Sequence, residues 1–103
     1  MTEKEQDVMI AKALDVQICI GSIDTRNELI CHTREKLEKL DVMKPHFIKI
    51  LGYTEEEGDT CVEIPLSKEV EAIELIKERL KKVIQEHEKA ISEEYEKLNS
   101  LLK

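Results

Sequence analysis

Three cysteines and three histidines are the side chains of this chain that could serve as nucleophiles, bases or metal ligands. Cys31 and His32 are adjacent, but neighbours on an α-helix point about 100° apart and cannot act as a catalytic pair. Cys61 and His46 are expected to face each other across a β-hairpin as a structural pair, because no further ligands have zinc-site spacing. We therefore expect no catalytic residue, no metal and no cofactor, and predict that the protein is not an enzyme.

One acidic cluster could contact a partner. Glu55, Glu56, Glu57 and Asp59 surround Gly58 and lack the alternating oxygen ligands of a calcium loop. The cluster is predicted to be a solvated turn, with contact to a basic surface of another protein as the alternative.

One basic cluster could bind an anion. Lys77, Arg79, Lys81 and Lys82 are interspersed with glutamates, which is typical of a mixed helix surface. The alternative is that Arg79 and Lys82 from several protomers hold a small anionic ligand such as a nucleotide.

Two heptad-spaced stripes must be buried against other helices. The first stripe consists of Met9, Val16, Ile23, Ile30 and Leu37, with Ala13, Ile20, Asn27 and Arg34 as expected companions; the second contains Val70, Leu80, Ile84, His87, Ile91 and Leu98. We predict that these residues form the seam of an oligomer. Asn27 and His87 are polar, so they could define register or stoichiometry, and a charged His87 could make assembly sensitive to pH.

Local signals delimit the elements. Thr2 and Glu5 form a capping-box pattern, and Pro45 disfavours helix at the residue before it, so a long helix is predicted over residues 2–42. A break near Gly21, with a strand over residues 15–20, is the alternative because β-branched residues alternate there. Ser67 is a good N-cap for a second long helix over residues 67–102.

A β-hairpin is predicted over residues 46–65, between the two helices. Ile48 and Ile50 share one face, and Val62 and Ile64 can share the opposing one, with Gly58 in the turn. An isolated hairpin is marginally stable in water, so its apolar side needs a cover.

The composition indicates one domain of a helix-rich class. The chain has 103 residues, 38% charged and 3% aromatic, with a net charge of −7. This acidity disfavours nucleic acid as a partner, and no apolar run reaches the roughly 20 residues of a membrane span. An odd number of cysteines and a charged segment over residues 1–7 indicate reduced thiols and a cytoplasmic location.

The predicted fold class is therefore mainly α with a β-hairpin: a long helix, a hairpin and a second long helix, packed as an antiparallel, coiled-coil-like pair. Two helices hide only one side of each stripe, so we expect a homo-oligomeric bundle.

The segment HFIKILGY, the hairpin after it and the long Glu/Lys-rich helix resemble the β-type subunits of prefoldin. That resemblance implies antiparallel helices, a hairpin that assembles with those of other protomers, and a chaperone function. The segment VEIPLSKEV and the charged helix that follows are similar to a loose group of small uncharacterised proteins of phages and mobile elements. This second resemblance implies no functional residues.

Three functions remain open at this point. The first is a non-enzymatic, self-associating protein-interaction module that acts as a scaffold, adaptor or inhibitor. The second is an oligomer that binds a small anionic ligand, and the third is a prefoldin-like chaperone.

Overall fold

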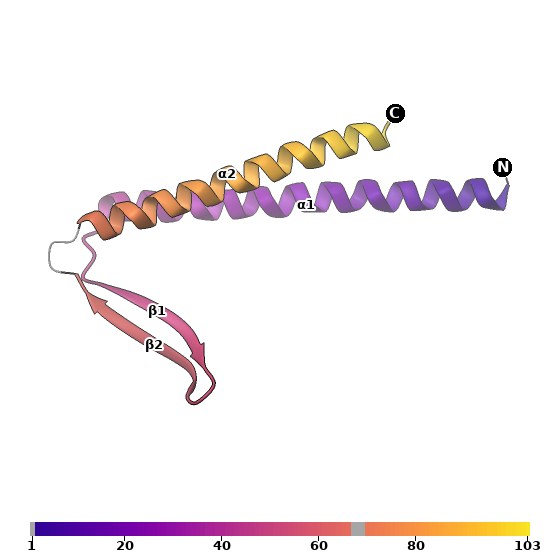
Figure 1. Cartoon of the computed structure of the whole chain (residues 1–103). Helices are drawn as coiled ribbons and strands as arrows, with labels where there is room; N and C mark the ends of the chain where they lie inside the picture. The colour runs from indigo at the N-terminus through magenta and orange to yellow at the C-terminus, as the bar shows by residue number, and fades with distance from the viewer. Residues whose placement is uncertain (1, 67–69) are drawn as a thin grey trace.

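The computed structural model describes residues 2–66 and 70–103 of the protein. Four elements follow one another: α1 (Glu3–Val42), β1 (Phe47–Thr54), β2 (Gly58–Pro65) and α2 (Val70–Leu101). The helix–hairpin–helix layout predicted from the sequence is confirmed. Figure 1 shows the two helices side by side and antiparallel, with the hairpin projecting from the end where α1 stops and α2 starts.

Helix α1 is continuous for 40 residues, so the predicted alternative of a strand over residues 15–20 is wrong. Thr2 and Glu5 form the expected capping box, in which each side chain accepts a hydrogen bond from the other residue's backbone N–H. The helix ends at Val42, and the C-cap residue Met43, two residues before Pro45, donates its N–H to the carbonyl of Lys39 at 2.9 Å. Heptad burial against α2 therefore outweighs the modest helix cost of Gly21 and the β-branched residues near it.

The hairpin consists of two eight-residue strands joined by a three-residue turn. Gly58 has φ of 72°, which a residue with a side chain rarely adopts, and the Thr54 hydroxyl accepts from the N–H of Glu57. At the base, the N–H of Leu66 donates to the carbonyl of His46 at 2.9 Å. Local turn chemistry thus explains why the chain reverses here.

Helix α2 has 32 residues and is shorter than α1. Ser67, the predicted N-cap, lies outside the described residues, as does the side chain of Val70. The first turns of α1 extend past the C-terminal end of α2 (Figure 1). Contacts between elements of the described chain join α1 with α2 and β1 with β2, and none joins the hairpin to a helix. The result is an elongated molecule of 70 × 36 × 15 Å.

Candidate interaction surfaces

Most of the residues predicted to form an oligomer seam pack between α1 and α2 of a single chain. Ile23, Ile30 and Ile84 are buried between the two helices, and half-buried seam residues continue the interface along both helices. These half-buried members are Val16, Leu37, Leu80, His87, Ile91 and Leu98. Met9 is exposed, and the first turns of α1 extend past the end of α2 (Figure 1). The stripes thus first join the two helices of one protomer.

The companion positions predicted for the first stripe are wrong. Ala13, Ile20, Asn27 and Arg34 are exposed, and the inward positions lie three residues, rather than four, after the stripe members from Val16 to Leu37. Cys19, Arg26, Thr33 and Leu40 occupy those positions and are buried or half-buried. Both spacings keep residues on one side of a helix; the position of α2 decides which of them is buried. Asn27 therefore has no role in the register of this helix pair.

Arg26 and His87 form a polar contact across the helix interface. Arg26 Nη1 donates to Nδ1 of His87 at 3.0 Å, and a guanidinium has no acceptor, so this His87 nitrogen must be unprotonated. The Nε of Arg26 is buried and has no hydrogen-bond partner among the residues described. A buried N–H without an acceptor costs free energy, so this atom lowers the stability of the helix pair.

Lys77 and Cys19 are two further polar seam residues. The Lys77 side chain is 16% exposed, and its Nζ lies 2.9 Å from Asp41 and 3.5 Å from Glu74. The hydrogen bond to Asp41 raises the pKa of Lys77 despite partial burial. Burial, reinforced by the carboxylate of Glu94, raises the pKa of the Cys19 thiol.

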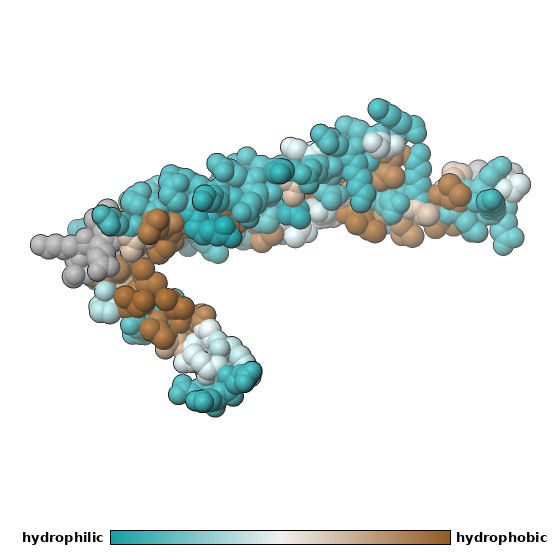
Figure 2. Space-filling view, in the orientation of Figure 1, coloured by the Kyte–Doolittle hydropathy of each residue, from teal (hydrophilic) through white to brown (hydrophobic). Residues whose placement is uncertain are grey.

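The hairpin has one aliphatic face, formed by Ile48, Ile50, Val62 and Ile64. Ile48 lies opposite Ile64 and Ile50 opposite Val62 in the strand register, so all four share one face and the predicted division between two faces is wrong. Ile50, Val62 and Ile64 are exposed. The other face carries the exposed side chains of Phe47, Leu51 and Tyr53 beside the pair of Lys49 and Glu63 at 3.9 Å. Figure 2 shows hydrophobic atoms on the hairpin, with hydrophilic atoms at its tip.

The acidic tip consists of Glu55, Glu56, Glu57 and Asp59, all of which are exposed. Among the described residues, no group of three histidine, cysteine, aspartate or glutamate side chains is arranged to hold a metal ion. The tip is therefore a charged, accessible end of the hairpin.

The basic residues of α2 lie beside carboxylates. Arg79 is 3.6 Å from Glu86, Lys81 is 3.6 Å from Glu78, and Lys82 is exposed. Such exposed pairs reduce the net positive field available to an anion.

The cysteine and histidine candidates do not form catalytic pairs. Cys61 lies opposite Leu51 in the strand register and His46 precedes β1, so the predicted facing of Cys61 and His46 is wrong. Cys31 and His32 are exposed, and each approaches a different oxygen of Glu35, at 3.9 Å. Neither arrangement supplies an activated nucleophile.

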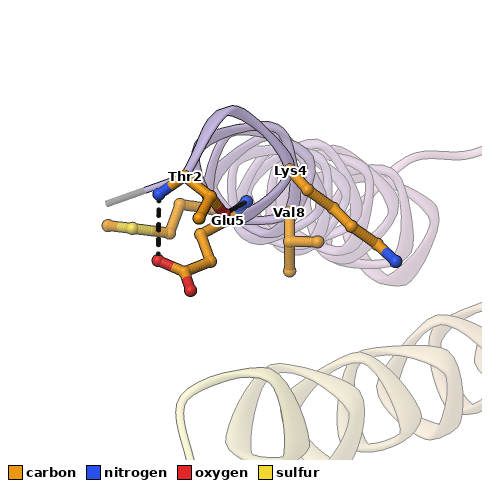
Figure 3. A pocket seen from close by; sticks show the side chains of 5 residues that line it. Thr2, Lys4, Glu5 and Val8 are labelled. Carbon is orange, nitrogen blue, oxygen red and sulfur yellow. Dashed lines mark hydrogen bonds between the residues drawn. The ribbon is translucent and has the colours of Figure 1, made fainter.

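An open groove lies on the part of α1 beyond the end of α2. Thr2, Lys4, Glu5, Val8 and Met9 line about 530 Å³ of space. Figure 3 shows Val8 pointing toward the side of α1 on which α2 lies, and both Val8 and Met9 are exposed. Two exposed apolar side chains, Val8 and Met9, thus lie beside the polar residues of the first helical turn.

Comparison with protein families, with curated proteins and with solved structures gives no match. Neither helix, over its described residues, combines the length and the apolar character that crossing a bilayer requires.

Proposed function

We propose that this protein is a non-enzymatic, self-associating interaction module that binds another protein through its hairpin. The observation that carries the proposal is the aliphatic face of Ile48, Ile50, Val62 and Ile64, which no helix of the described chain covers. A two-stranded hairpin needs a third strand or a packed cover for independent stability. Burial of this face in a complex supplies that cover.

The charges around this face favour a partner of opposite sign. The hairpin ends in Glu55, Glu56, Glu57 and Asp59, and the chain as a whole has a net charge of −7. An apolar patch rimmed by acids suits a partner with an apolar site and a basic rim, because the rim charges speed encounter and reject acidic surfaces. The function that follows is that of a scaffold, adaptor or inhibitor.

Self-association is tested by light scattering coupled to size exclusion over a range of protein concentrations. We expect a mass above the 12.0 kDa of one chain that rises with concentration. A mass of one chain at every concentration up to about 100 μM, where even weak specific dimers form, would contradict self-association.

Partner binding is tested with tagged protein recovered from the cells that naturally produce it. Ile50→Lys places a charge on the aliphatic face, whereas Leu51→Lys places the same charge on the opposite face. We expect a defined protein to accompany the wild type and Leu51→Lys but not Ile50→Lys. A bound nucleotide in place of a protein partner, detected by mass spectrometry, would instead support the anionic-ligand alternative with Arg79 and Lys82.

The prefoldin-like chaperone is the second candidate, and the same uncovered aliphatic face favours it. An exposed apolar surface can hold unfolded chains as well as a folded partner. A chaperone should suppress the aggregation of a denatured client protein in proportion to its concentration. Failure to suppress aggregation would remove this candidate and leave the interaction module.

A further inference from the structure

Helix α1 carries a second face that does not point toward α2. Its members are Leu14, Ile18, Gly21, Ser22, Thr25 and Leu29, which repeat at intervals of three and four residues and so lie on one side of the helix. Ile18 is 65% exposed, and Leu14 and Leu29 are also exposed. Figure 2 shows hydrophobic atoms on the helix pair outside the interface between α1 and α2. We call these six residues the second face.

Gly21 at the centre of the second face has no explanation within the chain. A glycine in a helix interior costs about 1 kcal/mol relative to alanine, and a Cβ added to Gly21 would meet nothing within 4 Å. A shallow groove of about 330 Å³ lies here, lined by Gly21, Ser22, Thr25, Arg26 and Leu29. A missing side chain beside an open groove lets another backbone approach closely.

The order of side chains makes the second face complementary to itself. If a second copy of α1 lies antiparallel with the two-fold axis between Gly21 and Ser22, Leu14 of each copy lies opposite Leu29 of the other. Ile18 then lies opposite Thr25, and the small residues meet at the centre. Large side chains thus pack at both ends of the contact while the backbones approach at the middle, as an isologous interface requires.

Charges on the edge of the second face agree with this arrangement. Asp15 and Arg26 are separated by about three helical turns and lie on the same side of α1. In the antiparallel pair, Asp15 of each copy lies within a turn of Arg26 of the other. The two residues then place opposite charges along one edge of the contact.

We propose that the second face is a homodimer interface in which two α1 helices pack antiparallel around Gly21 and Ser22. The proposal rests on the self-association proposed above and names the surface responsible for it. The aliphatic face of each hairpin then stays free to bind a different protein. The two hairpins lie at opposite ends of the paired α1 helices.

The decisive variant is Gly21→Leu, which stabilises the single chain and blocks the dimer. Leucine is a far better helix former than glycine, and a Cβ at position 21 meets nothing within 4 Å. The helix content should therefore not fall, nor should the melting temperature at concentrations where the wild type is also monomeric. The dimer dissociation constant should rise on the order of 100-fold, because the bulky side chain holds the backbones apart. Asn27→Leu is the matched control, on the opposite side of α1 and exposed, and should change the constant less than about threefold.

Cross-linking locates the contact independently. In a Cys31→Ser, Cys61→Ser background, Ser22→Cys should form a disulfide-linked dimer on mild oxidation, because the two cysteines lie beside the two-fold axis; Asn27→Cys should not. If the protein associates but Gly21→Leu leaves the dissociation constant unchanged and Ser22→Cys does not cross-link, the second-face dimer is wrong while self-association stands. A wild-type protein that is monomeric at all concentrations overturns both.

Discussion

At the scale of single residues, the interface between α1 and α2 contains polar side chains that apolar periodicity alone does not reveal. Thr33 is buried because its hydroxyl donates to the carbonyl of Leu29 at 2.7 Å, and Arg26 is tolerated because its guanidinium reaches His87. The Thr33 hydroxyl finds its acceptor within its own helix, whereas the partner of Arg26 comes from α2 and only the folded chain brings it within reach. The Arg26 Nε has no partner among the described residues.

The three thiols should differ in reactivity. Cys19 is 1% exposed and its thiol pKa is raised by burial and by Glu94, whereas Cys31 and Cys61 are exposed. A raised pKa leaves less thiolate at a given pH, so alkylation of Cys19 should need a higher pH than alkylation of a free thiol. At pH 8, mass spectrometry should show two fast modifications and a third slower on the order of tenfold or more.

Denaturant and a single substitution provide the controls for thiol reactivity. All three cysteines should react alike in concentrated guanidinium chloride, and Cys19→Ser should remove the slow modification. Modification of Cys19 as fast as that of Cys31 in the native protein would show that α2 does not cover it.

At the scale of elements, the two helices depend on each other for stability, and the hairpin depends on neither. Ile30 and Ile84 are buried where α1 and α2 pack, whereas Leu75 lies on the outer side of α2 and is 71% exposed. Tertiary burial of one side of each helix therefore stabilises the pair.

Truncation of a seam residue should cost far more than truncation of an outer residue. Ile84→Ala should lower the free energy of unfolding by about 2–4 kcal/mol, because it removes buried methyl groups and leaves a cavity. Leu75→Ala, on the same helix, should change it by less than about 0.5 kcal/mol. Urea denaturation followed by circular dichroism, at one fixed protein concentration, measures both; equal losses would contradict the packing of α1 on α2.

At the scale of the whole molecule, the chain has no central core. Its radius of gyration is 21.1 Å, whereas a compact domain of this length has about 13 Å. The extended shape follows from one layer of two helices and a hairpin that contacts neither helix among the described residues. Much apolar surface consequently stays exposed, at the hairpin, on the second face of α1 and at its N-terminal turns.

Small-angle X-ray scattering should detect this shape. Extrapolated to zero concentration with the Gly21→Leu variant, which we expect to be monomeric, the radius of gyration should be close to 21 Å. A value near 13 Å would mean that the hairpin folds back onto the helices. It would also remove the reason for proposing a partner at the aliphatic face.

The sequence by itself determined the elements, because the signals for them are local. The capping box at Thr2, the stop before Pro45, the turn at Gly58 and the heptad stripe through Ile23 and Ile30 each act within a few turns of chain. The helix–hairpin–helix order could be predicted for that reason.

Only the tertiary structure decided which neighbours of the stripe are buried and what each candidate residue contacts. Positions three and four residues from Ile23 lie on either side of the same stripe, and the path of α2 leaves Arg26 half-buried and Asn27 exposed to solvent. The strand register likewise places Cys61 opposite Leu51 rather than beside His46. Which helix positions are buried and which strand residues pair depends on how segments far apart in the chain pack together. Local periodicity makes the alternatives equally good, so small differences in packing decide between them.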